Sequence, residues 1–304
     1  MLPLLWARLQ PSLTVDFLGN DLLVRCASYL DADGLAQLGR TSARYGTPQA
    51  GQQRSLANEA ARQRFRQSAA DEEMSRLPKY EDESDVGLLR ALEQLRQPLC
   101  FDDLVGYGSS SQENLASVTC TAGRAIWSTA VSGHVMRGGR HFVEFEIANH
   151  GQRGSPLFHL GVIRPVTLTD GIEVEADWEG SVHPVRVSSS YKRAVAEKLR
   201  SQSTAKWGES NVHCCTYYCI SGLCYFTDWE NEDDFSFSGW HGLERLPGSG
   251  TVGLLLDLNE GTLSVFKNGR RLGAMKEGLG GEYCWFVTVG IPCTISISRD
   301  RAPN

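Results

Sequence analysis

The chain has 304 residues, enough for one large and one small domain, and its 41% hydrophobic and 22% charged residues are ordinary for a globular protein. A net charge of −6 gives no electrostatic reason to expect a nucleic acid or an anionic membrane as partner. No stretch approaches the roughly 20 apolar residues of a membrane span. The short apolar N-terminus does not fit a secretory signal, and nine unevenly spread cysteines indicate a reduced protein of the cytoplasm or nucleus.

The first 97 residues are predicted to be helical, because their apolar residues recur every three or four positions. The apolar positions within 18–30 fit one face of a helix, and Asp31 can cap a second short helix that follows. Residues 55–77 are predicted to form a further helix, whose thin apolar face needs a neighbour to pack on. A short amphipathic helix is predicted over 88–95.

After Pro98 the pattern changes, and apolar residues alternate with polar ones between glycine-rich turns. In 141–147 the apolar side chains fall on one face and two glutamates on the other, which is typical of a half-buried strand. Asn268-Gly269 indicates a type I′ hairpin turn, because both central residues of that turn need a positive φ. Short strands joined by tight turns predict an antiparallel sandwich. Further strands are predicted over 157–163, 251–258, 262–267, 270–275, 285–289 and 294–298.

The stretch 165–204 fits a strand pattern least well, since it mixes charges and serines with a helix-like segment over 191–200. We interpret it as an insertion between core strands.

A cluster of thiols is the strongest hint of metal chemistry, and consists of His213, Cys214, Cys215, Cys219 and Cys224. A zinc site usually needs paired ligands such as Cys-x₂-Cys, whereas these cysteines are adjacent or separated by three and four residues. The spacing therefore favours small buried thiols of a β core. The seven histidines lie in no catalytic motif, and the acidic run 230–234 lacks the calcium-loop pattern. No catalytic residue, metal ligand or cofactor is predicted.

Residues 250–273 contain an apolar strand, an Asp, the run Gly-Thr-Leu-Ser, an aromatic residue and the run Asn-Gly-Arg-Arg-Leu-Gly. This order resembles the C-terminal signature of SPRY (B30.2-like) domains, and 138–147 and 160–162 resemble two earlier strands of that family. The resemblance implies a mainly β fold, a SPRY-type antiparallel sandwich over 98–300 that binds protein and is no enzyme. The tryptophan that some peptide-binding members carry in the last loop is absent from 289–292.

Residues 17–45 resemble an F-box, with Leu-Leu, Tyr-Leu and later leucines at the family's positions. Gly19 and Gly34 stand where that family usually has Pro and Asp. The resemblance implies a small α-helical F-box-like segment over 12–50, followed by a helical linker region over 51–97.

Together the two resemblances imply a protein-binding adaptor, the substrate-recognition subunit of a cullin–RING (F-box type) ubiquitin ligase. The F-box-binding adaptor of that ligase would be contacted by Leu18, Leu22, Leu23, Leu30, Leu35 and Leu38, which partly form the core of the segment. An unidentified protein or peptide substrate would be bound by loops over 149–153 and 229–240 and by the insertion, through Asn149, His150, Arg153, Trp178, Trp229 and Trp240. The alternative is a SPRY scaffold without any link to ubiquitin, in which the first 97 residues are a helical cap.

Overall fold

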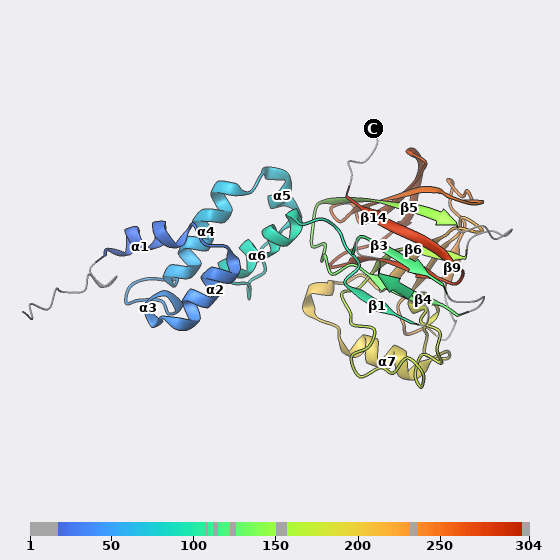
Figure 1. Cartoon of the computed structure of the whole chain (residues 1–304), viewed down its shortest axis with the longest axis horizontal. Coiled ribbons are helices and arrows are strands. Elements are labelled where there is room, and N and C mark those ends of the chain that lie inside the picture. Colours follow the sequence, from blue (N-terminus) through green and yellow to red (C-terminus); the bar gives the residue numbers. More distant parts are fainter. Residues whose placement is uncertain are drawn as a thin grey trace, which may run out of the picture. The chain divides into compact units, whose positions relative to one another are not determined.

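A computed structural model describes residues 18–106, 109–111, 115–121, 126–149, 157–231 and 236–299. The chain folds into two compact units, whose elements are labelled in Figure 1. In the described part, the first unit contains 18–71 and 79–96, and the second contains 72–78 and 97–299. Within these ranges no helix is both long and apolar enough to cross a bilayer.

The first unit is built around one central helix, which contacts the four others. Its small buried side chains, Ala57, Ala60 and Ala61, let neighbouring helices approach closely. The cap predicted at Asp31 is confirmed, because its Oδ1 accepts a hydrogen bond from Gly34 N at 2.8 Å. The helices are α1 (Asn20–Ala27), α2 (Ala32–Thr41), α3 (Ala43–Gly46), the central α4 (Leu56–Ser68) and α6 (Asp85–Arg96).

The single helix predicted over 55–77 is wrong, because two helices occupy that stretch. The α4 helix ends where Ala69 turns to an extended conformation, with φ −77° and ψ 130°. After this break α5 (Asp71–Arg76) begins, and most of it belongs to the second unit. The break could not be predicted from the sequence, because residues 55–77 contain neither glycine nor proline, the residues that usually mark the end of a helix.

The second unit consists of two seven-stranded sheets in which all neighbouring strands are antiparallel. In spatial order, sheet A contains β1 (Asp103–Val105), β4 (Ser128–Val131), β13 (Cys284–Val289), β6 (Phe158–Ile163), β7 (Cys214–Tyr218), β8 (Cys224–Thr227) and β9 (Ser236–Ser238). Sheet B contains β12 (Arg270–Glu277), β11 (Thr262–Lys267), β10 (Gly250–Asp257), β5 (Arg140–Asn149), β14 (Cys293–Ser298), β3 (Ser117–Cys120) and β2 (Ser109–Ser111). The predicted fold class, a mainly β antiparallel sandwich preceded by helices, is confirmed.

The hairpins predicted from the late part of the sequence form as expected. Asn268 and Gly269 have φ values of 47° and 76°, as a type I′ turn requires. The turn joins β11 to β12, and β11 also pairs with β10 from Val252↔Lys267 to Asp257↔Thr262. The same β10 pairs with β5 on its other side, so the predicted strands lie next to one another in sheet B.

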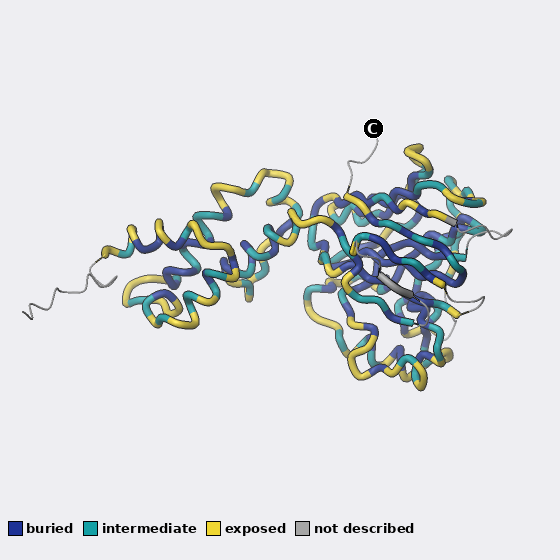
Figure 2. The backbone as a smooth tube through the Cα atoms, in the orientation of Figure 1, coloured by how far each residue is buried: buried dark blue, intermediate teal, exposed yellow. Residues whose placement is uncertain are grey.

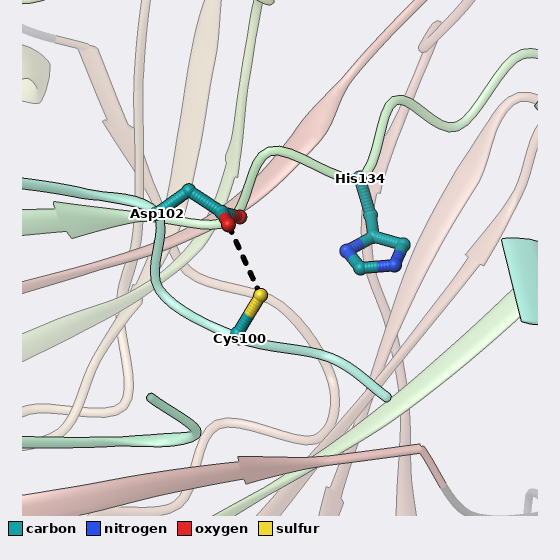
Figure 3. Close-up of side chains that lie close together, drawn as sticks. All are labelled: Cys100, Asp102 and His134. Carbon is teal, nitrogen blue, oxygen red and sulfur yellow. Dashed lines mark hydrogen bonds between the residues drawn. The ribbon is translucent and has the colours of Figure 1, made fainter. Parts of the chain in front are cut away.

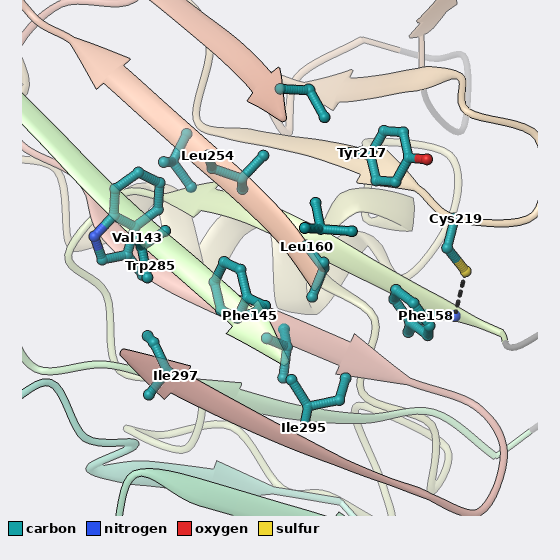
Figure 4. Packing of buried hydrophobic residues seen from close by; sticks show 14 of the residues in the cluster. Val143, Phe145, Phe158, Leu160, Tyr217, Cys219, Leu254, Trp285, Ile295 and Ile297 are labelled. Atoms are coloured by element: carbon teal, nitrogen blue, oxygen red, sulfur yellow. Dashed lines mark hydrogen bonds between the residues drawn. The ribbon is translucent and has the colours of Figure 1, made fainter. Parts of the chain in front are cut away.

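The main core lies between the two sheets, where alternate side chains of facing strands interdigitate (Figure 4). From sheet B it receives Val143, Phe145 and Leu254, and from sheet A it receives Leu160 and Trp285. All five are at most 2% exposed, and the buried strands stand out against exposed loops in Figure 2. The alternation of apolar and polar residues in 141–147 therefore correctly predicts which side chains of β5 face the core.

The insertion over 165–204 forms a second core on the outer face of sheet A. It contains the short helix α7 (Arg193–Ser201), whose Val195 and Leu199 are completely buried. They belong to one apolar cluster with Ile163 of β6 and Phe286 of β13, which point away from the main core. The insertion is thus an ordered layer of the fold, and it leaves one end of that outer face less covered.

Candidate functional site

A row of aromatic side chains crosses the outer face of sheet A beside the insertion. We call it the aromatic row; it consists of Trp127, His159, Tyr218, Tyr225 and Phe237. Trp127 directly precedes β4, and the other members come from β6, β7, β8 and β9, which are consecutive in the sheet. The row arises because each of these strands places alternate residues on the outer face, and the register aligns those positions.

The rings form a continuous chain of contacts. His159 stacks on Tyr218 with 4.3 Å between ring centroids, and Trp127 lies edge-on to His159 at 5.5 Å. Tyr225 is 5.4 Å from Tyr218 and 5.9 Å from Phe237. Phe237 is 62% exposed, whereas the two tyrosines and the tryptophan are half-buried. Large aromatic side chains of this kind, fixed by neighbours yet open on one side, are the usual anchors of protein-binding surfaces.

His159 of the row is itself buried, and a second buried histidine lies next to it. His183, from the insertion, is 4.5 Å from the Trp127 ring and 4.6 Å from His159. His159 Nδ1 lies 3.0 Å from Thr216 Oγ1, but its Nε2 and both ring nitrogens of His183 have no hydrogen-bond partner among the described residues. Buried polar atoms are normally paired, and one ring nitrogen of a neutral imidazole donates while the other accepts, so a buried water molecule could pair with these atoms.

The electrostatics of the row favour neutral histidines and one cation. Burial lowers the pKa of both His159 and His183 well below the usual value, and the nearby Arg186 lowers each further. The guanidinium of Arg186 itself lies 5.9 Å from the Trp127 ring. The site therefore combines apolar rings, neutral imidazoles and the positive charge of Arg186 beside Trp127.

The first unit presents a different surface, made of exposed apolar side chains on α1 and on the residues that flank it. Leu22 is 53% exposed and Tyr29 80% exposed, and Leu18 and Leu30 are also exposed. Leu22 lies within α1, whereas Leu18 precedes the helix and Tyr29 and Leu30 follow its C-cap, Ser28. Tyr29 also borders a cleft of about 890 Å³ that is lined by α1, α4 and the loop before α4. We call these four side chains the α1 face.

The six leucines predicted for the ligase adaptor divide into two groups. Leu23 and Leu35 are at most 1% exposed and belong to the core of the first unit. Leu38 is half-buried, and the other three belong to the α1 face. The burial of Leu23 and Leu35 fits the expectation that some of the leucines form the segment's own core, and contact of the others with a ligase adaptor stays a prediction.

The exposed tryptophan anchors expected at Trp178 and Trp229 are wrong, because both side chains are completely buried. Trp178 Nε1 donates to Leu168 O at 3.0 Å, and Trp229 Nε1 donates to Pro184 O at 3.0 Å. Both belong to the second core, where they fasten the insertion to sheet A. A tryptophan can be buried when its indole N–H has a hydrogen-bond acceptor inside the protein. The acceptors here are backbone carbonyl groups, which the sequence alone does not identify.

The remaining predicted contact residues do not gather at one place in the described structure. Trp240 is half-buried, packs against the main core and donates from Nε1 to Gly222 O at 2.8 Å. Asn149 ends β5, and its backbone pairs with Cys293. His150 and Arg153 lie outside the described residues.

Sequence reasoning identified the loop that ends at Trp240 and so came close to Phe237, but it missed the other members of the aromatic row. A signal for His159 exists, since it is a polar residue between the apolar residues Phe158 and Leu160. Trp127 has no such local signal, because it lies far along the chain from the other members. Tyr218 and Tyr225 lie on β7 and β8, which are consecutive along the chain and pair with each other.

The thiols considered for zinc are divided between the two faces of sheet A. Cys214 belongs to the second core, whereas Cys215, Cys219 and Cys224 belong to the main core. Cys215 Sγ and Cys224 Sγ are 3.7 Å apart within that core. Burial raises the pKa of each of the thiols of Cys214, Cys215 and Cys219. This arrangement agrees with the interpretation of the cluster as buried core thiols.

Comparison with known proteins gave matches to solved structures alone. No family model matches the chain, and no curated protein matches it. The SPRY domain of human HERC1 is 14% identical, with a TM-score of 0.42 over 66% of this chain and 99% of that domain. The TRIM65 PSpry domain is 16% identical, with a TM-score of 0.39 over 67% and 93%. A human SPRY domain is 9% identical, with a TM-score of 0.38 over 65% and 97%.

Proposed function

We propose that this protein is a non-enzymatic adaptor with a binding surface on each of its two units. In this proposal the sandwich is a SPRY-type module that holds a protein or peptide on the aromatic row. The helical unit is an F-box-like domain that docks on the F-box-binding adaptor of a cullin–RING ubiquitin ligase. The observation that carries the proposal is the coexistence of two exposed apolar surfaces, the aromatic row and the α1 face, on separately folded units.

The aromatic row supports the first half of the proposal. A partner side chain laid against Phe237 and Tyr225 would bury apolar area at little entropic cost, because neighbouring rings already restrict the two side chains. The SPRY-like motif of 250–273 lies in β10 to β12 of the opposite sheet. The motif therefore belongs to the sandwich itself and contributes no residue to the aromatic row.

The α1 face supports the second half. Leu23 and Leu35 already stabilise the unit from inside, so Leu22 and Leu30 are not needed for its core. A monomer gains nothing from exposing several large apolar side chains on one short helix and its flanking residues, and such a patch is typical of an interaction site. The F-box resemblance of 17–45 supplies the identity of the proposed partner.

The mechanism is proximity. A protein bound to the sandwich and a ligase bound to the helical unit are held on one chain, which raises the effective concentration of one near the other. No chemistry by this chain is required. Its buried thiols Cys214 and Cys215 have raised pKa values, the reverse of what a nucleophilic cysteine needs.

Affinity purification of the tagged full-length protein tests the two halves together. Leu22→Asp places a charge on the α1 face, so we expect the variant to lose the ligase adaptor and to retain proteins bound by the sandwich. Phe237→Asp should have the opposite effect. Leu115→Asp is the matched control, since Leu115 is 57% exposed on the second unit and belongs to neither surface, and it should retain both kinds of partner.

Two outcomes would contradict the proposal. If the wild-type protein retains sandwich partners but no ligase adaptor, the chain is a scaffold without a link to ubiquitin. If Phe237→Asp retains every partner of the wild-type protein, the aromatic row is not the binding surface.

A further inference from the structure

Three metal-ligating side chains meet on the second unit, where the segment before β1 lies beside the loop after β4 (Figure 3). They are Cys100, Asp102 and His134, and their ligand atoms all lie within 4.8 Å of one another. Cys100 Sγ is 3.1 Å from Asp102 Oδ1. Cys100 and His134 are half-buried and Asp102 is exposed, so an ion could reach the group from solvent.

The fold puts these side chains together for a simple reason. Leu99 and Phe101 are buried in the main core, and the period of two in extended chain then turns Cys100 and Asp102 to the other side. Asp102 N donates to Val131 O at 3.0 Å, which pairs this segment with the end of β4. The chain that leaves β4 therefore brings His134 alongside the first two residues.

Surrounding contacts hold two of the groups in place. Gly133 N donates to Asp102 Oδ2 at 2.6 Å, and Ser132 Oγ lies 3.5 Å from His134 Nδ1. A Cβ atom on Gly133 would lie 2.8 Å from Asp102 Oδ2, so a side chain there would displace the carboxylate from its present position. The loop itself is fastened to β13, because Ser132 N donates to Trp285 O at 2.9 Å. Hydrogen bonds of this kind orient ligands in metal sites.

We propose that Cys100, Asp102 and His134 bind a zinc ion, with a fourth coordination position open to water. One sulfur, one nitrogen and one carboxylate oxygen form a ligand set that suits zinc, and three protein ligands with an open position are a common arrangement. Zinc–ligand bonds of about 2.0–2.3 Å place neighbouring ligand atoms about 3.4–3.6 Å apart. Side-chain rotations that move the ligand atoms by roughly 1 Å would bring them to this spacing.

Local electrostatics agree with a cation at this position. Cys100 Sγ lies 3.1 Å from Asp102 Oδ1, and a thiolate so close to a carboxylate is unfavourable unless a positive charge lies between them. When the zinc–sulfur bond forms, the thiol proton leaves to solvent. The bound ion would clamp the segment before β1 to the loop after β4. The site does not depend on what the aromatic row or the α1 face binds.

Metal titration of the purified full-length protein, reduced and stripped of metal, tests this site. Zinc should bind with a stoichiometry of one and raise the melting temperature, because it binds the folded state. Cobalt should give a thiolate-to-metal charge-transfer band together with the visible spectrum of a tetrahedral ion. Cys100→Ser should remove the charge-transfer band and lower zinc affinity about 100-fold or more, at least as much as the loss of an outer contact does.

Two further variants make the outcome decisive. His134→Gln should also lower zinc affinity, and it leaves the thiol in place if Cys100→Ser proves poorly folded. Cys26→Ser is the matched control, since Cys26 is an exposed cysteine of the first unit, and it should bind zinc as the wild-type protein does. The proposal fails if the wild-type protein binds no zinc, if cobalt shows no thiolate band, or if Cys100→Ser and His134→Gln bind zinc unchanged.

Discussion

Trp229 and Phe237 lie close in sequence, yet they have opposite roles. The indole of Trp229 is buried and hydrogen-bonded to the insertion, whereas the Phe237 ring is 62% exposed. Trp229 also has a positive φ of 60°, which a non-glycine residue keeps when its surroundings hold it there. Its backbone N donates to Thr227 Oγ1 at 3.0 Å, which helps to fix that conformation. Composition alone cannot separate these roles, because both residues are aromatic.

We therefore expect Trp229→Ala to lower the free energy of unfolding by about 3–5 kcal/mol, the usual cost of removing a buried tryptophan. Phe237→Ala should lower it by less than about 1 kcal/mol, since little is buried there. Urea denaturation monitored by far-UV circular dichroism measures both values. Equal destabilisation by the two variants would show that the burial difference does not exist in solution.

The buried histidines predict how stability depends on pH. The pKa values of His159 and His183 are lowered in the folded protein, and that of His141 is lowered to about 4. Below pH of about 6.5 the unfolded chain binds protons on these residues while the folded chain does not. Acid therefore favours unfolding, and each histidine should cost up to about 1.4 kcal/mol per pH unit below that value.

Urea unfolding at several pH values between 7.5 and 5 measures this slope. The double variant His159→Gln, His183→Gln should show a shallower slope than the wild-type protein, whatever its stability at neutral pH. His241→Gln removes an exposed histidine and should leave the slope unchanged. A wild-type stability that stays flat below pH 6.5 is the result this explanation does not allow.

At the scale of elements, Gly161 shows why a short motif in β6 can be recognised before the fold is known. A Cβ atom at this position would lie 1.9 Å from Cys215 O of the neighbouring β7. No side chain fits there unless the two strands separate. We expect Gly161→Ala to lower the free energy of unfolding by about 1–3 kcal/mol or more.

Gly248 supplies the comparison, because a Cβ atom added to it would have nothing within 4 Å. Gly248→Ala should leave stability unchanged or raise it by about 0.4–1 kcal/mol, through a smaller entropy of the unfolded chain. Thermal or urea unfolding of both variants decides the matter. A Gly161→Ala protein as stable as Gly248→Ala would mean that β6 and β7 do not pair as closely as described.

Elements with a strong local pattern are the ones that sequence predicts. The hairpins around Asn268-Gly269 were predictable because a turn with positive φ needs particular residues, and the flanking strands have six or eight residues. Strands such as β1, β4 and β9 were not, because three or four residues contain too few alternations to recognise. The insertion's helix α7 was expected from its sequence, but its burial against sheet A was not.

At the scale of the whole molecule, the candidate site was only partly predictable. The helix α1 is visible in the sequence, so Leu22 could be named in advance, whereas Leu18 and Leu30 lie outside the helix that the structure forms. In the aromatic row, Trp127 and His159 lie far along the chain from the members on β7 to β9, and only the strand order of sheet A makes them neighbours. Contacts that depend on long-range pairing leave no local pattern to read.

The central claim is that one chain carries two separate binding surfaces, of which the α1 face docks on an F-box-binding ligase adaptor. Isothermal titration of the purified full-length protein with that purified adaptor tests it most directly. We predict a one-to-one complex with micromolar or tighter affinity, weakened at least about 30-fold by Leu22→Asp, as expected when a contact worth about 2 kcal/mol is lost. Leu115→Asp should bind like the wild-type protein. Absence of binding, or equal binding by Leu22→Asp, would contradict the claim.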